Sequence, residues 1–395
     1  MRLVFLAQNW PFPPICGESS IVFNLLKELS NRHDIYLIIL GERAGDDQLP
    51  FKSIKGIEVI NCLRQKSLLA YMRNIYRPIP YGIYYGFNMD IAEKINSLIK
   101  RIKPEVVQLC SLGLLPYGVF IPSGVPKIMV AADCLSLAMK RLIDKEANLF
   151  KKSHYLLNYF KSRHVERNSY PLFTYVVLVS DVDLNIIQNV SRRSKLALIN
   201  LGVDTEYFCR STKSLSNNLG IVGNFGYKPN ERGALFLISD VFRSINKIYP
   251  DTKIYIVGVN PTRKILNCHN AENRIIITGY VEDVRYYYER IGIFVSYLDM
   301  GAGIKIKVLE AMSMCLPVVG SKIAFEGIDG KNGIHFLQAG TKIEAINIIE
   351  RLLSDKPKMI EIGNNARKLV LNKYSWREKA KEYELLWEKC LSEYG

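Results

Sequence analysis

The chain has 395 residues, a length for which two domains are the usual arrangement. Hydrophobic residues make up 48% of it and charged residues 23%, the proportions of a folded soluble protein, and no apolar run approaches the length that spans a bilayer. The formal net charge of +15 predicts an anionic partner, for which nucleic acid, an anionic membrane and a phosphorylated substrate are the candidates.

The N-terminus and the cysteines indicate the compartment. The opening MRLVFLAQNWPFPP holds only a short apolar stretch before polar residues and prolines, which is not the pattern of a signal peptide. The eight cysteines form no CxxC pair and the five histidines form no HxxxH pair. We therefore expect reduced thiols in a cytoplasmic protein, and no metal site built by the protein.

The first half of the chain alternates apolar runs of strand length with helical patterns. Residues 3–8 are strand-like, and the apolar residues of 18–31 have helical spacing. Further buried strands are predicted at 35–40, 57–60, 105–109, 127–132, 175–180 and 196–199. Apolar strands separated by helices indicate a parallel sheet covered on both faces.

A second unit of the same type follows the polar stretch CRSTKSLSNNLG, residues 209–220, which is the best candidate for a linker. Strands are predicted at 219–224, 253–258, 274–279, 291–297 and 316–321. Helices are predicted at about 230–248, from about residue 304, and at about 341–354, 357–372 and 375–392. Two doubly wound domains are therefore expected, and ligands should bind at the turns that follow strands.

Two segments are rich in both basic and aromatic or apolar residues. Residues 61–103 hold eight Lys or Arg against two acids, and residues 140–167 hold eight against three. This composition suits a face that binds an anionic membrane. A solvated surface of a basic protein is the alternative.

The first turn with a chemical pattern is WPFPPICGESS, which follows the first strand. Gly17 permits close backbone approach, and a helix N-terminus behind a glycine is a site for an anion or a hydroxyl. A plain connecting turn explains the residues equally well. The dinucleotide pattern GxGxxG is absent.

The second such stretch is IVGNFGYKPNERGALFLI, residues 221–238. Pro229 favours the first turn of a helix, and Lys228 and Arg232 flank it. Basic side chains beside a strand end would suit a diphosphate. The alternative is solvent-facing charge at a helix start.

The third stretch, SYLDMGAGIKIK, leaves a strand and enters a helix through Gly301 and Gly303. Backbone N–H groups there would point at an anion. Lys305 and Lys307 add cations where the helix dipole disfavours them, and this conflict suggests a function. Glu310 lies on nearly the same side of the helix as Lys307, where a carboxylate can accept hydrogen bonds from a ribose diol. A simple Lys307–Glu310 surface pair is the alternative.

These residues resemble the nucleotide-sugar glycosyltransferases of family 4, and the resemblance covers nearly the whole chain. KVLEAMSMCLPVV is similar to the family's helix-and-strand signature, and NLGVDTEYF (200–208) resembles the element that ends its first domain. FEGIDGKNGIHFL and KYSWREKAKEYELLW resemble its C-terminal course. GYKPNERGALF and GIKIK are closest to the branch associated with exopolysaccharide sugar transferases.

The resemblance implies the GT-B fold, an α/β arrangement of two Rossmann-like, doubly wound parallel-sheet domains that face a cleft. Residues 1–208 would be the acceptor-binding domain and 209–219 the linker. Residues 220–374 would be the nucleotide-sugar-binding domain, and the helix 375–395 would pack back on the first domain.

The resemblance also implies residue roles in the second domain. Glu310 would hold the donor ribose, and the backbone of Gly303, Ile304 and Lys305 would hold the diphosphate. Arg232 resembles the family's basic residue that neutralises the leaving phosphate, with Lys228 as the alternative.

In the first domain, the resemblance points to two positions. Gly17 resembles the glycine near the donor diphosphate and the acceptor. Asp133 occupies the region where many members place a polar side chain beside the transferred sugar.

One departure from the family pattern bears on the choice of sugar. Most members carry a further glutamate where this chain has Ala302, and that carboxylate usually contacts the hydroxyls of the donor sugar. Lys305 and Lys307 stand where many members have Gly and Pro, and we interpret them as replacement phosphate ligands.

The expected activity is sugar transfer from a nucleotide-diphosphate donor to a glycan or lipid-linked acceptor, in cell-surface polysaccharide synthesis. It would retain the anomeric configuration and need neither cofactor nor metal. The alternatives are a GT-B nucleotide-sugar epimerase and a non-catalytic protein that binds sugar nucleotides or membranes. The expected partners are the donor, the acceptor and, as a candidate, the anionic inner face of the membrane, while no motif supports nucleic acid.

Overall fold

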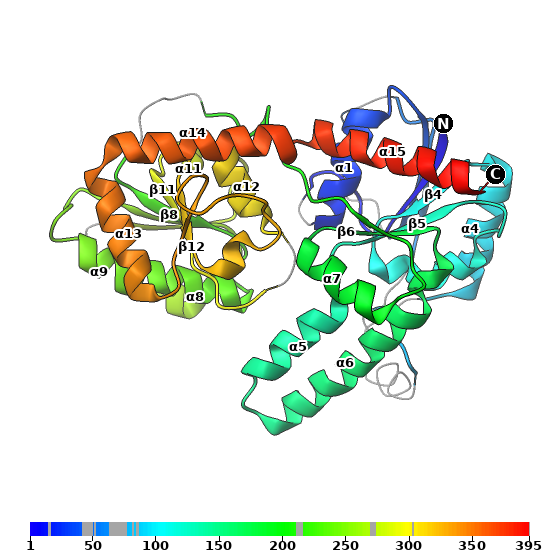
Figure 1. Cartoon of the computed structure of the whole chain (residues 1–395), viewed down its shortest axis with the longest axis horizontal. Coiled ribbons are helices and arrows are strands. Elements are labelled where there is room, and N and C mark those ends of the chain that lie inside the picture. The colour runs from blue at the N-terminus through cyan, green and yellow to red at the C-terminus, as the bar shows by residue number, and fades with distance from the viewer. Residues whose placement is uncertain are drawn as a thin grey trace. The chain divides into compact units, whose positions relative to one another are not determined.

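The computed structural model describes residues 1–14, 17–41, 50, 53–62, 77–80, 83, 87–210, 216–268, 274–301 and 304–394. These residues form two compact units (Figure 1). The first comprises Met1–Asn200 together with Lys379–Gly395, and the second comprises Leu201–Glu378.

The first unit contains a parallel sheet with the strand order β3-β2-β1-β4-β5-β6-β7. Its strands are β1 Arg2–Ala7, β2 Asp34–Leu40, β3 Gly56–Ile60, β4 Val106–Leu109, β5 Lys127–Ala131, β6 Tyr175–Leu178 and β7 Leu196–Leu198. The strands that flank the sheet's centre are buried along almost their whole length, which is why their sequences are continuously apolar.

Helices surround this sheet. They are α1 Gly17–Leu29, α4 Met89–Ile102, α5 Leu135–Lys145, α6 Leu149–Asn168, α7 Asp181–Val190 and most of α15 Trp376–Tyr394, with short 3₁₀ turns at Leu112–Phe120 (η1) and Tyr170–Leu172 (η2). Helices α5 and α6 form a hairpin, and Figure 1 shows it projecting away from the sheet. In the part of the chain that the structure describes, no helix is long and apolar enough to cross a membrane.

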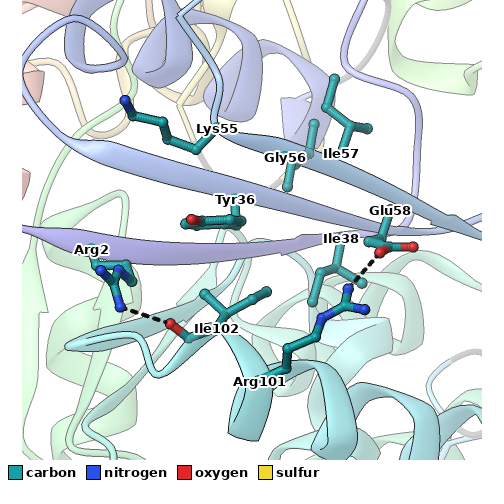
Figure 2. Close-up of a pocket in the computed structure, with 10 residues that line it drawn as sticks. Arg2, Tyr36, Ile38, Lys55, Gly56, Ile57, Glu58, Arg101 and Ile102 are labelled. Atoms are coloured by element: carbon teal, nitrogen blue, oxygen red, sulfur yellow. Dashed lines mark hydrogen bonds and ion pairs between the residues drawn. The ribbon is translucent and has the colours of Figure 1, made fainter.

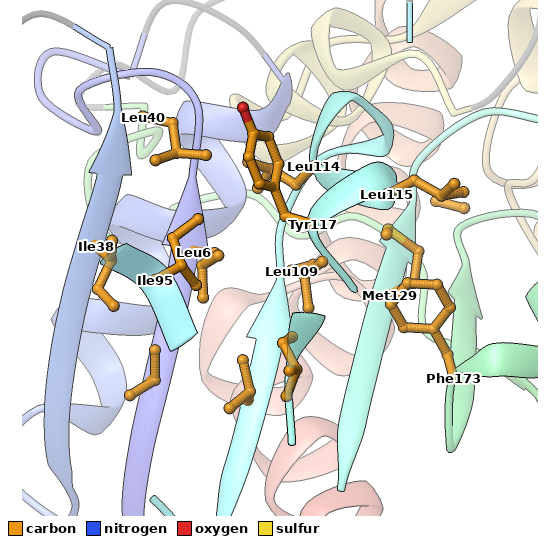
Figure 3. Packing of buried hydrophobic residues seen from close by; sticks show 14 of the residues in the cluster. Leu6, Ile38, Leu40, Ile95, Leu109, Leu114, Leu115, Tyr117, Met129 and Phe173 are labelled. Carbon is orange, nitrogen blue, oxygen red and sulfur yellow. The ribbon is translucent and has the colours of Figure 1, made fainter. Parts of the chain in front are cut away.

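The core of the first unit lies between the sheet and the helices (Figure 3). Leu6, Ile38, Leu109 and Met129 come from four neighbouring strands and are fully buried. Ile95 of α4 packs in the same cluster. Because the apolar side chains come from strands far apart in sequence, this core fixes the strand order that aligns the turns after β1, β4 and β5.

The second unit contains a parallel sheet with the order β10-β9-β8-β11-β12-β13. Its strands are β8 Leu219–Val222, β9 Ile254–Val257, β10 Ile275–Gly279, β11 Ile293–Ser296, β12 Val318–Gly320 and β13 Leu337–Gln338. Its helices are α8 Lys228–Phe236, the π-helical turn η3 Leu237–Val241, α9 Phe242–Ile245, α10 Arg263–Leu266, α11 Arg285–Tyr288, α12 Ile306–Ser313, the 3₁₀ turn η4 Lys322–Phe325, α13 Lys342–Ser354 and α14 Lys356–Lys373.

The predicted strands are confirmed in both halves, with ends that differ by a few residues. The helix expected over about 230–248 is present as α8, η3 and α9 in succession, with one turn of π geometry. Residues 211–215 of the linker candidate lie outside the described residues, as do 63–76, 81–82 and 84–86 of the first basic segment.

The second unit begins earlier than the sequence suggests, at Leu201. The backbone N–H of Val203 donates to the carbonyl of Tyr374 at 2.7 Å, and Val203 forms a β-bridge with Ser375. The carbonyl of Phe208 accepts hydrogen bonds from Ser313 Oγ and from the guanidinium of Arg367. These bonds join residues 201–208 to the second unit.

The C-terminal helix α15 packs mainly in the first unit. The indole of Trp387 is fully buried and donates to Gln108 Oε1 of β4 at 3.0 Å, and it contacts Phe5 of β1 edge-on. Glu384 forms ion pairs with Arg32 and with His33 when that ring is protonated. The chain therefore enters the second unit and then contributes a last helix to the first.

Candidate functional site

Each sheet has a point at which the strand order reverses. In the second unit this point lies between β8 and β11, because the chain proceeds outward from β8 to β10 on one side and from β11 to β13 on the other. In open α/β sheets, ligands bind beyond the carboxyl ends of the strands at such a point. The turns after β8 and β11 are therefore where a ligand is expected.

A pocket of about 260 Å³ lies at this position. Its polar walls include Tyr227 and Asn230 from the turn after β8, and Ser296, Lys305 and Lys307 from the end of β11 and the segment behind it. Among the described residues that line it, the two lysines are the charged ones. The pocket is therefore suited to an anionic ligand.

The turn after β8 is held by its asparagines. Asn224 accepts a hydrogen bond from the backbone N–H of Gly226 at 3.0 Å, and its carbonyl accepts from Asn230 Nδ2 at 2.9 Å. Asn260, from the turn after β9, donates to Asn224 Oδ1 at 3.2 Å. These bonds fix the turn that carries Tyr227 into α8, whose first turn contains Pro229.

The turn after β11 has an open backbone at Gly301, as expected for a glycine. Gly301 has φ +141°, a conformation that residues with a side chain rarely adopt. The Lys305 Cε atom lies 3.3 Å from the position that a Cβ on Gly301 would occupy, so the lysine side chain folds over this turn. Ala302 and Gly303 lie outside the described residues. Ile304 is buried and lines the pocket.

Lys307 and Glu310 form an ion pair one helical turn apart on α12. Lys307 Nζ lies 3.0 and 3.1 Å from the two carboxylate oxygens, and Glu310 is buried whereas Lys307 is half exposed. The buried hydroxyl of Tyr288 donates to Glu310 Oε2 at 2.9 Å. Burial and the nearby carboxylate raise the pKa of Tyr288 well above its ordinary value, so it remains a donor. The ion pair that was the alternative interpretation of these two residues is therefore present. Lys307 lines the pocket, whereas the buried Glu310 is not among the residues that line it.

Lys228 and Arg232 lie on α8, close to the pocket but not among the residues that line it. Lys228 Nζ pairs with Glu231 at 2.8 Å, and this hydrogen bond lowers the pKa of the Glu231 carboxyl. Arg232 pairs with Asp299 in the segment after β11. The Arg232–Asp299 pair thus joins the two turns that border the pocket.

Gly17 and the turn after β1 lie at the reversal point of the first sheet, between β1 and β4. A Cβ on Gly17 would meet no atom within 4 Å, so the space beside it is open. Glu18 accepts from the backbone N–H of Gln8 at 2.5 Å and from Asn9 Nδ2 at 2.7 Å. Ser111, after β4, donates to Gln8 Oε1 at 2.8 Å. These bonds tie the two turns together.

Asp133 is exposed in the turn that follows β5. The next residues are held by Glu166 of α6, which accepts from the backbone N–H of Ser136 at 2.9 Å and from Cys134 Sγ at 3.6 Å. Burial raises the pKa of the Glu166 carboxyl and raises the pKa of the Cys134 thiol to about 12. The hairpin of α5 and α6 is thereby joined to the turn that carries Asp133.

The buried carboxyl of Glu166 predicts a pH-dependent stability. Because its pKa is higher in the folded than in the unfolded chain, its contribution to the free energy of unfolding is greatest below the ordinary carboxyl range and falls as the pH rises through the folded pKa. Glu166→Gln removes the charge and keeps an acceptor for Ser136. Between about pH 4 and about pH 8, chemical denaturation should show the stability of the parent falling relative to this variant.

The exposed Glu388 of α15 provides the matched control, because Glu388→Gln removes a carboxylate that is already solvated. The difference in the free energy of unfolding between this control and the parent should change little over the same pH range. If the free energies of unfolding of Glu166→Gln and the parent differed by the same amount at every pH, the expectation would be contradicted.

A second cavity, of about 460 Å³, lies in the first unit (Figure 2). It is bordered by Arg2 at the start of β1, Gly56 at the start of β3 and Arg101 at the end of α4. Figure 2 shows Arg101 reaching Glu58, at 2.7 Å, and Arg2 reaching the carbonyl of Ile102. Because it lies at the amino ends of the strands and these cations have protein partners, it is not the expected position for an anionic ligand.

Side chains that could bind a metal ion do not gather at these turns. Across the described ranges, no group of three or more His, Cys, Asp or Glu side chains is arranged to hold a metal ion. A metal-independent reaction stays a prediction.

The comparison with protein families decides the class of the second unit. Residues 216–355, which include both turns that border the pocket, match the model of the family described as Glycosyl transferases group 1. These residues form a glycosyltransferase group 1 domain. Lys228, Arg232, Lys305, Lys307 and Glu310 all lie within this domain.

Relatives of known sequence extend beyond the group 1 domain. Sulfoquinovosyl transferase SQD2 of Arabidopsis thaliana is 23% identical over 327 residues, which are 76% of this chain and 59% of that protein. An uncharacterised 44.6 kDa protein in the cps region of Klebsiella pneumoniae is 22% identical over 244 residues, 60% of this chain and 61% of that protein. The matches thus span about six tenths of the length of these relatives.

Solved structures support the fold over nearly the whole chain. Alr3699/HepE of Anabaena, solved in complex with UDP, has a TM-score of 0.70 at 14% identity and covers 98% of this chain and 100% of that one. The GT-B fold expected from the sequence is confirmed. The group 1 domain is its second Rossmann-like unit.

Some residues at the lysine-lined pocket of the second unit were not predicted from the sequence. Tyr227 and Asn230 line the pocket, and Tyr288 anchors Glu310. For Tyr227, the signal was its position directly before Lys-Pro at the start of α8. Tyr288 had no such signal, because it lies in RYYYER, where three tyrosines are consecutive and only the fold distinguishes the buried one.

Proposed function

We propose that the protein transfers a sugar from a nucleotide-diphosphate donor to a glycan or lipid-linked acceptor in the cytoplasm, without a metal ion and with retention of configuration. The pathway proposed is cell-surface polysaccharide synthesis, on the basis of the motifs GYKPNERGALF and GIKIK. The observation that carries the proposal is the lysine-lined pocket at the strand-order reversal of a glycosyltransferase group 1 domain.

The pocket suits the leaving group of such a reaction. When the bond between the anomeric carbon and the β-phosphate oxygen breaks, negative charge grows on that oxygen. Lys305 and Lys307 supply positive charge at the pocket wall, and Arg232 lies on the neighbouring helix. Stabilising the departing diphosphate is the main task that these residues can perform.

The remaining steps follow from same-face attack. The acceptor oxygen forms a bond to the anomeric carbon on the face that the diphosphate leaves, and its proton passes to the departing phosphate oxygen. No enzymic nucleophile takes part. The donor ribose would be held by Glu310, which keeps acceptor capacity beyond its bonds to Lys307 and Tyr288.

Two measurements test the proposal. A panel of nucleotide sugars with different bases and sugars should contain at least one that raises the melting temperature, since a ligand that binds only the folded state stabilises it. That donor, labelled in the sugar, is then incubated with oligosaccharide and lipid-linked acceptors in the presence of EDTA, and the anomeric configuration of the product is determined by NMR.

The outcomes separate the candidate functions. A labelled glycoside that retains the donor's configuration supports the proposal. Conversion of the donor into an isomeric nucleotide sugar would indicate an epimerase. Donor binding with neither product, across all acceptors, would indicate a protein that binds nucleotide sugars without catalysis.

A further inference from the structure

Helix α6 presents apolar side chains to solvent. Phe150 is 90% exposed, Leu149 is 81% exposed and Phe160 is 61% exposed, and Leu156 and Leu157 are also exposed. Positions seven or eleven residues apart lie on one face of a helix, so Leu149, Leu156 and Phe160 form a single line with Phe150 and Leu157 beside it. We call these five residues the α6 stripe.

The stripe faces away from the packed side of the same helix. Ser162, Val165 and Glu166 are buried, and they lie roughly opposite the stripe around the helix. A surface helix usually directs its apolar residues inward and its charged residues outward, whereas α6 directs the apolar residues of the stripe to solvent. Contiguous exposed apolar residues of this kind mark an interaction surface.

The tip of the hairpin is ordered by a cap. Asn148 Oδ1 accepts hydrogen bonds from the backbone N–H groups of Phe150 at 3.0 Å and Lys151 at 3.1 Å. This cap starts α6 at Leu149 and so fixes the two most exposed apolar side chains in its first turn. Figure 1 shows the hairpin projecting from the rest of the unit, with the turn between α5 and α6 at its end.

Basic side chains border the stripe. Lys152 and Arg163, eleven residues apart, are exposed along the edge of the stripe beside Leu156, and the exposed Arg167 lies in line with Leu156 and Phe160. The acids of the hairpin are Asp144 and Glu146, near its turn, and the buried Glu166. The local charge is positive, in keeping with the net charge of +15 for the whole chain.

We propose that the α6 stripe inserts into the headgroup region of an anionic lipid bilayer, with Lys152, Arg163 and Arg167 on the lipid phosphates. Helices with apolar residues on one face and basic residues at its edges lie in this way at membrane surfaces. A second copy of this chain is a worse occupant, because stacking two stripes would bring like charges together. The α6 stripe belongs to the first unit, and its binding to lipid does not depend on sugar transfer.

The test uses the full-length protein and sedimentation with vesicles of phosphatidylcholine alone or of phosphatidylcholine mixed with phosphatidylglycerol. The parent should bind the mixed vesicles, and binding should fall as salt is added. Leu149→Ser with Phe150→Ser should lower the partition coefficient at least about tenfold, because the free energy gained by burying even one such apolar side chain corresponds to about that factor. Lys152→Gln with Arg163→Gln should lower it about fivefold for each cation.

Matched controls separate the stripe from general effects of composition. Ile343→Ser with Leu385→Ser removes two exposed apolar side chains elsewhere, and Lys247→Gln with Lys253→Gln removes two exposed cations from the second unit. Both controls should bind as the parent does. Melting curves for every variant show whether it is folded.

Phe150→Trp gives a readout that leaves the stripe apolar. The three tryptophans of the chain, Trp10, Trp376 and Trp387, are buried, so the new indole is the one that reports on solvent. Its emission should shift to the blue on addition of the mixed vesicles and should be quenched by brominated lipid.

Several results would overturn the proposal. These are binding to neither vesicle, equal binding to both, unchanged binding of the stripe variant, or an indole emission of the Phe150→Trp variant that does not respond to vesicles. A parent that is dimeric by analytical ultracentrifugation, and becomes monomeric with Leu149→Ser and Phe150→Ser without binding vesicles, would assign the stripe to a second copy instead.

Discussion

Replacement of both Lys305 and Lys307 by alanine is expected to lower turnover by about 100- to 1000-fold, the scale seen when one donor to a developing oxyanion is removed. Both side chains line the pocket of the second unit. The charge on a departing diphosphate grows in the transition state, so the loss in turnover should exceed the loss in donor affinity. Steady-state kinetics, with donor binding measured separately by calorimetry, distinguishes the two.

The single variants should differ because the two lysines have different surroundings. Lys305 folds over Gly301 at the turn, whereas Lys307 is paired with Glu310. Lys305→Ala should therefore act mainly on turnover, while Lys307→Ala should also weaken donor binding by disturbing Glu310. Lys247→Ala with Lys253→Ala is the control for lost charge. A double variant that turns over at the parent rate would show that these lysines are surface charge and that backbone groups alone hold the phosphates.

Glu310→Ala is expected to weaken donor binding by about 1.5–3 kcal/mol, the usual contribution of hydrogen bonds to a charged group. It should also lower the free energy of unfolding, by about 1–3 kcal/mol, since it leaves the buried Tyr288 hydroxyl without its carboxylate acceptor. Isothermal titration with the donor measures the first effect, and urea denaturation measures the second.

Tyr288→Phe separates these two effects. It removes the hydroxyl and leaves the Glu310 carboxylate and its ion pair with Lys307 in place. The free energy of unfolding should fall, while the affinity for the donor should stay close to that of the parent. If Glu310→Ala binds the donor as tightly as the parent does, the ribose is held elsewhere and Glu310 serves to position Lys307.

The sequence was sufficient to predict the strands β1 to β12 in chain order, whereas the two-residue strand β13, Leu337–Gln338, was not predicted. Runs such as IYIV of β9 and IFV of β11 are apolar without alternation because both faces of a parallel sheet are covered, and that pattern is local. The turn after β11 was predicted as a binding site from residues that are also close in sequence. Gly301 and Lys305 line the pocket together, and their role in binding stays a prediction.

Interactions between residues distant in sequence were beyond these local patterns. Arg232 and Asp299 join two turns across the reversal point, and Tyr288 reaches Glu310 from a different helix. The end of the first unit was placed too late in the chain for the same reason, since Val203 belongs to the second unit through bonds to Tyr374 and Ser375. Which residues become partners in this way depends on how the sheets are assembled, and a short stretch of sequence does not contain that information.

The indole of Trp387 on Gln108 has a consequence for biosynthesis. The first unit requires α15, which a ribosome makes only after the second unit. Until then, the side of the first sheet that carries Phe5 and Gln108 lacks its covering helix, while the second unit has all its strands and can close. The nascent chain therefore completes its later-made sheet first, and a premature stop before α15 would release a protein whose second sheet is complete and whose first sheet is open, which invites aggregation.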